Sequence, residues 1–389
     1  MDRRLAVSIA IIQFFFAVTW TVYVVYLPQL VERSGIARSW VPWILVADQV
    51  VFAVVDVATG FWLDKVRARL ARFGGWILAV TAISCVAFVL LPFIAVSPVL
   101  LLALIFVWAV SSSALRAPPW MLLSRHAATP GIPWLATLVL TGTALASAAA
   151  PYLGIALRGV DVRLPFIVST LTLLVSVGAL VLAERKAALS DKISEAPPAK
   201  AAPHQTILFF AALLAMAVGF QAHFSLNSAP QYLRFAAPGD LPWLMPAFWF
   251  GFNLAMLAAS RGVRRFGAPA LMALAAAAGA VAIVACVIAP GLATLAAAQF
   301  VAGGCWGVAS VAAYTGAIAL GRTGREGRFL GTLFAMFAVA TLLRIAMVAS
   351  GLAAAPQLKG FLPWLPETAW LLAGLLLLVS ARPRAATRR

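Results

Sequence analysis

Long apolar segments recur along almost the whole chain, and only short polar stretches separate them. The hydrocarbon core of a bilayer is about 30 Å thick, so a helix that crosses it needs roughly 20 mostly apolar residues. The pattern therefore predicts an all-α membrane protein with about twelve transmembrane helices, at residues 5–30, 42–63, 76–95, 99–123, 134–157, 164–183, 207–232, 241–260, 268–289, 292–320, 329–351 and 365–380. The first segment is too long for the apolar region of a signal peptide and has no small-residue cleavage site, so we expect it to form the first helix.

Composition agrees with a membrane protein, and the distribution of charge predicts its orientation. Of the 389 residues, 63% are hydrophobic and 11% are charged, against about 25% charged residues in soluble domains. The formal net charge is +17, and most Lys and Arg residues fall in the termini and in loops on one side of the predicted membrane. By the positive-inside rule, we expect a multi-pass protein of the cytoplasmic (inner) membrane with both termini in the cytoplasm. Its basic loops would then lie beside anionic lipid, and a nucleic-acid partner is not expected.

The sequence lacks the patterns that enzymes and metal proteins use. Cys85, Cys286 and Cys305 lie in apolar segments, without a CxxC pair or a His at ligand spacing. Gly-x-Ser-x-Gly, His-Glu-x-x-His and Walker-type phosphate loops do not occur. We therefore expect no metal site, no cofactor and no enzymatic activity.

The longest polar stretch divides the predicted helices into two sets of six. It covers residues 184–206 and is rich in Ala, Pro, Lys and Glu, a composition typical of a linker with little fixed structure. Arg72-Phe73-Gly74 follows the second predicted helix, and Arg265-Phe266-Gly267 follows the eighth, so the halves share a short motif at matching positions. We expect a six-helix bundle at 1–183, a cytoplasmic linker at 184–206 and a second six-helix bundle at 207–389.

The segment that follows the second predicted helix carries a family resemblance. Residues 56–78 read DVATGFWLDKVRARLARFGGWIL. Gly60-x-x-x-Asp64-Lys65 followed by basic residues resembles the loop between helices 2 and 3 of the major facilitator superfamily. The longer run resembles the same loop of the glycoside-pentoside-hexuronide cation symporters, at Asp64, Lys65, Arg67, Arg69, Arg72 and Trp76. The resemblance implies two six-helix bundles around a central cavity, secondary transport of a small solute by alternating access, and gating by Asp64, Lys65, Arg67 and Arg69.

The same resemblance places Asp56 where that family has a cation-site aspartate. Phe52 stands where the family commonly has a second aspartate, and Gln49 stands where its melibiose-type members have an arginine. Arg116 replaces an acidic or polar residue. These departures favour a proton over sodium as the coupling ion, and Arg116 favours an anionic group on the substrate.

Two other functions remain open. Gly142 and Pro151-Tyr152-Leu153-Gly154 are similar to a run in helix 5 of proton-driven drug exporters, although small-residue helix faces also arise from packing alone. A non-transporting membrane sensor built on a transporter scaffold is the other alternative. Such a sensor would have no need for charged residues midway through its helices.

Four charged residues interrupt the predicted helices, namely Asp48, Asp56, Arg116 and Arg344. A charge near a helix centre costs roughly 2.5–3.5 kcal/mol, so each of them needs a partner or water. Counted from the cytoplasmic helix ends, Asp56 and Arg116 lie at similar depths, whereas Asp48 and Arg344 both lie in the outer half. We expect Asp56 to pair with Arg116 and Asp48 to pair with Arg344. The pairs either hold helices together only, or Asp56, Asp48 and Arg116 act in ion coupling.

The second and eleventh predicted helices face each other in the fold that the resemblance implies. An Asp48–Arg344 salt bridge would therefore close the outer side. Asp64, at the cytoplasmic end of the second helix, would accept hydrogen bonds from unpaired amides near Arg328 and Phe329 at the start of the eleventh helix and so close the cytoplasmic side.

Polar and aromatic side chains at depth predict the lining of a central cavity. His223 and Asn227 share a helix face at i, i+4 in the most polar of the predicted helices. Other candidates lie too deep to be interfacial anchors. We expect the substrate, a small polar or amphipathic solute, to contact Trp20, Tyr23, Gln49, His223, Asn227, Asn253 and Trp306.

Overall fold

The computed structural model of the protein describes residues 3–66, 73–121, 129–187, 202–322 and 324–381. The long helices of the N-terminal half are α1 (Arg3–Arg33), α2 (Val41–Val66), α3 (Phe73–Ile94), α4 (Pro98–Ala114), α6 (Ile132–Ala156) and α7 (Arg163–Ala187). Those of the C-terminal half are α8 (Pro203–Phe220), α11 (Pro246–Phe266), α12 (Ala268–Val287), α13 (Leu292–Gly321), α14 (Glu326–Ala349) and α16 (Leu365–Ala381).

Shorter elements extend or connect these helices. The π-helix η4 (Gln221–Asn227) and α9 (Ser228–Tyr232) continue α8, and η5 (Pro238–Asp240) and α10 (Leu241–Leu244) lead into α11. The remaining connections contain η1 (Arg38–Trp40), η3 (Thr129–Gly131), η6 (Leu352–Ala354), α15 (Pro356–Lys359) and η7 (Leu362–Trp364). In the described part of the chain, 11 helices are long and apolar enough to cross a membrane, and the twelfth, α7, is apolar over Arg163–Ala179. The expected all-α membrane fold is therefore confirmed.

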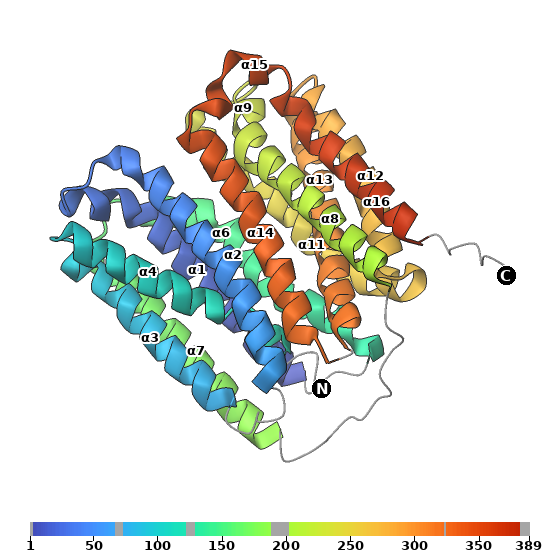
Figure 1. Ribbon diagram of the computed structural model, residues 1–389. Coiled ribbons are helices and arrows are strands. Elements are labelled where there is room, and N and C mark those ends of the chain that lie inside the picture. Colours follow the sequence, from blue (N-terminus) through green and yellow to red (C-terminus); the bar gives the residue numbers. More distant parts are fainter. Residues whose placement is uncertain (1–2, 67–72, 122–128, 188–201, 323, 382–389) are drawn as a thin grey trace.

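Each half of the chain packs mainly on itself (Figure 1). In the first half α1 contacts α6 and α7, α3 contacts α4 and α7, and α2 contacts α4. In the second half α13 contacts α11, α12 and α14, while α16 contacts α8 and α12. The two halves meet where α2 lies against α14 and α6 lies against α11. The domain boundaries at 183 and 207 stay a prediction, because most of the predicted linker lies outside the described residues.

Both ends of the helical region lie on one side of the molecule. α1 begins and α16 ends on this side, which we call the terminal side (Figure 1). Near the start of α8, Gln205 Nε2 donates to the carbonyl of Ser380 at the end of α16, at 3.2 Å. The connections from α1 to α2 and from α14 to α16 lie on the opposite side, which we call the far side.

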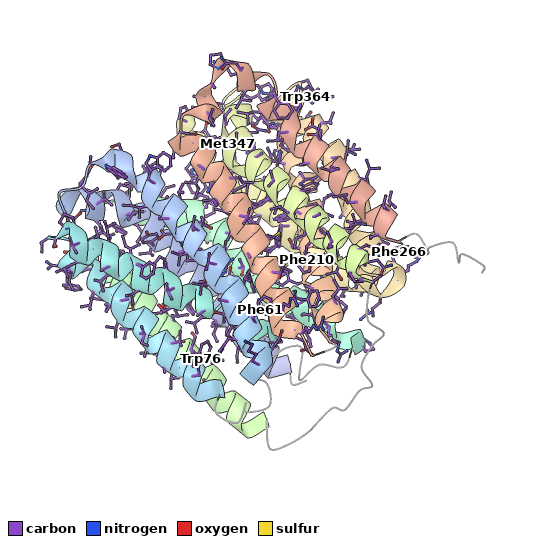
Figure 2. The ribbon with its side chains drawn as sticks, in the orientation of Figure 1. Phe61, Trp76, Phe210, Phe266, Met347 and Trp364 are labelled. Carbon is purple, nitrogen blue, oxygen red and sulfur yellow. The ribbon has the colours of Figure 1, made fainter. Side chains whose placement is uncertain are left out.

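The outer surface is apolar, as a lipid environment requires. Large aliphatic side chains point outward along the helices (Figure 2), and Val175 and Val281 are 70% and 71% exposed. Exposed tryptophans lie at helix ends on the far side, at Trp40, Trp243 and Trp364. Trp at this depth is typical of the membrane–water interface.

Because lipid supplies no hydrophobic drive between helices, close backbone packing holds them together. A Cβ atom on Gly303 of α13 would overlap the carbonyl oxygen of Phe248 on α11, and one on Gly251 would overlap the carbonyl of Phe300. The same holds between the two halves, where Gly60 of α2 packs on the backbone of Gly327. These glycines set how closely the helices approach.

Replacing Gly303 with leucine is expected to lower the free energy of unfolding by about 1–3 kcal/mol, because a side chain there forces α11 and α13 apart. Gly178→Leu on α7 is the matched control, since no atom lies within 4 Å of the position that its Cβ would take. Thermal unfolding in detergent should show a lower Tm for Gly303→Leu only. Equal Tm values for the two variants would contradict the packing argument.

Candidate functional site

A cavity of about 660 Å³ lies between the two halves of the chain. Its wall is rich in aromatic residues, with tryptophans from four helices at Trp20, Trp108, Trp249 and Trp306. Polar groups project into it from Gln13, Gln49, Ser112, Thr143, Ser147, Gln221, Ser225 and Thr341, and the cations that line it are Arg116 and Arg344. Of the residues expected at a substrate site, Trp20, Gln49 and Trp306 line this cavity.

The cavity extends toward the far side. Its lining includes Pro151, near the far-side end of α6, and Met245, at the start of α11. On the terminal side α2 and α14 are in backbone contact, since a Cβ on Gly331 would overlap the carbonyl oxygen of Asp56. Access from the terminal side is therefore blocked at this crossing.

The predicted pair of Asp56 and Arg116 is confirmed. Arg116 Nη1 donates to Asp56 Oδ2 at 2.8 Å, and Ser113 Oγ donates to Asp56 Oδ1 at 2.8 Å. The carboxylate is fully buried, while 18% of the arginine side chain is exposed to the cavity. The guanidinium also lies 4.8 Å from the ring centroid of Phe334 and 5.6 Å from that of Phe52, where cation–π attraction supplements the ion pair.

An interruption of the fourth transmembrane segment positions Arg116. α4 ends at Ala114, and the helix resumes at 118 after a turn through Leu115, Arg116 and Ala117. The cause is local, because Pro118 and Pro119 carry no N–H and the residue before a proline avoids helical geometry. The turn aims the arginine at α2. Broken helices at mid-depth are tolerated where they line a cavity.

Asp64 joins the end of α2 to the start of α14. Its Oδ1 accepts the N–H of Gly327 at 2.7 Å, and its Oδ2 accepts the N–H of Arg328 at 2.9 Å. The expected contact with unpaired amides is therefore present, one residue earlier than expected because α14 begins at Glu326. Lys65 is exposed beside it. Arg67 and Arg69 lie outside the described residues.

The expected salt bridge between Asp48 and Arg344 is not formed, although the structure describes both residues. Asp48 Oδ2 accepts the hydroxyl of Tyr23 at 2.7 Å, and Arg344 Nε donates to Gln221 Oε1 at 2.9 Å. The physical reason lies in these partners, because Tyr23 of α1 and Gln221 of η4 hold the two charged groups within their own halves of the chain. Each ionisable group has a neutral hydrogen-bond partner instead.

His223 and Asn227 both lie in the π-helix η4 and hydrogen-bond to different parts of the chain. His223 Nε2 is 2.9 Å from Gln299 Oε1 of α13, while Asn227 Nδ2 donates to the carbonyl of Leu362 at 2.9 Å. Both side chains are buried and are not among the described residues that line the cavity. The expectation that they line it is therefore wrong. π-turns inside α-helices frequently occur at functional sites.

Two more expected lining residues lie behind the wall. The Tyr23 side chain is fully buried, donates to Asp48 and packs 4.5 Å from the ring of Trp108. Asn253 Nδ2 donates to the carbonyl of Trp249 one turn earlier, at 2.8 Å. Neither is among the described lining residues of the cavity, so they support its wall.

Several lining residues were absent from the expected substrate site. Gln221, Ser225, Phe220 and Trp249 lie on the second half of the chain and face the cavity. The polar character of residues 221–231 was a visible signal for Gln221 and Ser225, but the aromatic residues give no such signal, because aromatic side chains are common on any transmembrane helix.

The fold matches solved structures over nearly its whole length, whereas no protein-family model and no curated protein matches the sequence. The human organic anion transporter MFSD10 (TETRAN) superimposes with a TM-score of 0.74 at 14% identity, covering 97% of this chain and 100% of that one. The E. coli fucose:proton symporter FucP gives 0.71 at 13% identity, with 97% and 98% covered. A bacterial homologue of the iron transporter ferroportin, in an outward-facing state, gives 0.70 at 15% identity, with 97% and 99% covered.

These matches define the architecture. FucP is described as a major facilitator superfamily transporter, and this chain has the same fold. At such low identity the likeness concerns the fold alone. The finer resemblance to the glycoside-pentoside-hexuronide branch stays a prediction.

Proposed function

We propose that the protein is a secondary active transporter that moves a small solute across the membrane by alternating access. The observation that carries the proposal is the cavity between the two halves, which is closed on one side by α2 against α14 and reaches the buried Asp56–Arg116 pair. The solved structures with this fold include a fucose:proton symporter and an organic anion transporter. A membrane sensor would not need this combination.

The coupling ion that fits Asp56 is a proton. Both carboxylate oxygens accept from donors, Ser113 Oγ and Arg116 Nη1. A hard metal cation needs several oxygen ligands, and a positively charged guanidinium beside the carboxylate opposes its binding. Protonation of Asp56 needs no further ligand and would release Arg116. Asp48, which bonds to the neutral Tyr23, is the second candidate for the coupling group.

The charge distribution supports an orientation with the terminal side in the cytoplasm. Arg261, Arg264 and Arg265 lie at the terminal-side end of α11, and Arg325 and Arg328 lie at the start of α14. By the positive-inside rule, the protein would sit in the cytoplasmic membrane with both termini inside the cell. The cavity then extends toward the outside of the cell.

Alternating access is tested by labelling Ser225→Cys in a variant without the three native cysteines. Ser225 lines the cavity, so a membrane-impermeant maleimide should reach it from outside intact cells and, in the alternate state, from the cytoplasmic face of inverted vesicles. Arg38→Cys, at the exposed far-side rim, is the control and should react from one side only.

Two outcomes decide the proposal. Labelling of Ser225→Cys from both sides, with Arg38→Cys reacting from one, supports alternating access and fixes the orientation. If Ser225→Cys reacts from one side only, with and without a pH gradient, the protein does not alternate and the sensor alternative is favoured.

A further inference from the structure

The two arginines in the cavity differ in charge balance. Arg116 is neutralised by Asp56 at 2.8 Å. Arg344 donates through Nε to Gln221 Oε1, an uncharged amide, and no carboxylate among the described residues lies within 4.0 Å of its guanidinium. A cation at this depth carries a substantial free-energy cost unless it meets water or an anion. The cavity wall therefore holds one uncompensated positive charge.

The head of Arg344 is held in a fixed orientation. Gln221 Nε2 donates to Thr341 Oγ1 at 2.9 Å, which leaves Gln221 Oε1 pointing at Arg344 Nε. Thr341 lies one helical turn before Arg344 on α14, and Gln221 is the first residue of the π-helix. The Nε donor is thus occupied by the protein, whereas Nη1 and Nη2 have no protein partner among the described residues. Two parallel N–H groups at the end of a guanidinium match the two oxygens of a carboxylate.

An aromatic layer lies deeper in the cavity. Phe220 stacks on Trp306 with ring centroids 4.8 Å apart, and Phe337, two turns from Arg344 on α14, lies 6.1 Å from Trp306. Phe220, Trp306 and Phe337 all line the cavity. A ligand held at the guanidinium would place an apolar body against these rings.

We propose that the solute is an amphipathic organic monoanion, an aromatic or similarly apolar carboxylate. Its carboxylate would bind Nη1 and Nη2 of Arg344, and its apolar part would lie against Phe220, Trp306 and Phe337. The cavity volume of about 660 Å³ lies within the usual range for small-molecule sites, roughly 300–1,000 Å³. A single unbalanced charge selects a monoanion. This inference rests on the proposed transport function, because it names the class of solute for the same cavity.

The carboxylate of Asp48 can compete with the substrate carboxylate for the guanidinium of Arg344. In a state closed on the far side, Asp48 and the substrate would compete for the same guanidinium. The substrate carboxylate would then be displaced as the cavity opens to the terminal side. A purely gating role for Arg344 makes a different prediction, since a latch affects neutral and anionic ligands alike.

The test compares probes of nearly equal shape, indole-3-acetate and its neutral amide indole-3-acetamide, with acetate as the anion that lacks an apolar body. Binding is measured calorimetrically on the full-length protein in lipid nanodiscs. We expect indole-3-acetate to bind about ten- to a hundredfold tighter than the amide, from a charge-assisted bidentate contact, and tighter than acetate as well. Arg344→Gln should remove this preference by weakening indole-3-acetate while leaving the amide within about twofold.

Two control variants keep the result interpretable. Arg344→Lys retains the charge without the paired N–H groups and should keep part of the preference. Arg38→Gln removes the same charge from the exposed far-side rim and should leave the affinity for every probe unchanged.

Equal affinity of the wild-type protein for the acid and the amide, or no binding of the acid, overturns the proposed substrate class. Equal weakening of both probes by Arg344→Gln assigns the arginine to gating and also overturns it. Failure of the transport proposal is a separate result, because labelling of Ser225→Cys measures access to the cavity and does not depend on the binding of a carboxylate.

Discussion

Replacing Asp64 with alanine is expected to open the terminal side of the protein and to shift its conformational equilibrium by about a hundredfold. The carboxylate accepts the N–H groups of Gly327 and Arg328 at 2.7 and 2.9 Å. These amides are at the start of α14, where they have no partner inside the helix and where the helix dipole favours an anion. Asp64 thus ties the first half of the chain to the second.

The size of the effect follows from the bonds that are lost. A hydrogen bond to a charged group contributes about 1.5–3 kcal/mol, and the Arg328 contact is exposed, so about 3 kcal/mol for both together is a moderate value. Each 1.4 kcal/mol changes an equilibrium about tenfold. Spin labels at Val7 of α1 and Arg264 of α11, both exposed on the terminal side, should show a longer distance in Asp64→Ala than in the parent protein.

Two variants separate this latch from a general loss of charge. Asp64→Asn keeps one acceptor oxygen and should give an intermediate shift. Asp161→Ala removes a carboxylate that accepts the N–H of Arg163 at 2.8 Å within one half of the chain, so it should leave the distance unchanged. An unaltered distance distribution in Asp64→Ala would refute the latch.

The depth of the charged side chains in the membrane could be predicted from the sequence. The apolar segments gave the helices, and residue counting from the helix ends placed Asp56 level with Arg116, which the structure shows as an ion pair. The contact of Asp64 with the start of α14 was also expected, because a carboxylate and unpaired amides at matched depth attract each other. The depths use only the constant rise of 1.5 Å per residue in an α-helix, while the choice of α14 as the partner of α2 came from the family resemblance.

The partners of individual side chains could not be predicted in the same way. His223 and Asn227 are four residues apart in η4, yet His223 contacts Gln299 of α13 and Asn227 contacts the carbonyl of Leu362. Both partners lie far away along the chain, so the spacing within one helix does not identify them. The predicted Asp48–Arg344 pair failed for a related reason, since each of the two groups has a neutral partner within its own half of the chain.

Asp56 and Asp64 lie eight residues apart on α2 and both act on helices beyond their own. Asp64 contacts the backbone of α14 directly, and Gly331 of α14 packs on the backbone of Asp56. A change at Asp56 that moves α2 would therefore loosen the crossing that Asp64 holds closed. Protonation of Asp56 at mid-depth would therefore be coupled to opening of the terminal side through α2 itself.

Asp56→Asn is expected to abolish the response of the protein to pH while leaving both conformations accessible. In the wild-type protein, protonation of Asp56 would break its pair with Arg116 and free α2 from the broken fourth segment. The Val7–Arg264 label distance should then differ between about pH 5.5 and about pH 8.5. Asparagine carries no titrating proton and preserves the hydrogen bond from Ser113, so the distance should no longer change with pH.

Two comparisons make the assignment to Asp56 specific. Asp48→Asn removes the other carboxyl group at depth on α2 and should retain the pH response, as should Tyr314→Phe, which removes a hydroxyl on α13 that interacts electrostatically with Asp56 and Arg116. Asp56→Asn leaves the Arg116 charge uncompensated, at a cost of about 3–5 kcal/mol, so the double variant Asp56→Asn/Arg116→Gln should recover thermal stability and remain insensitive to pH. Transport in reconstituted vesicles is the second measurement. Proton-driven accumulation of the tightest-binding of the indole and acetate probes should be lost in Asp56→Asn, while exchange of that probe at equal pH persists. If the pH response persists in Asp56→Asn and disappears in Asp48→Asn, the proton is carried by Asp48, and the Asp56–Arg116 pair serves only to hold α2 against α4.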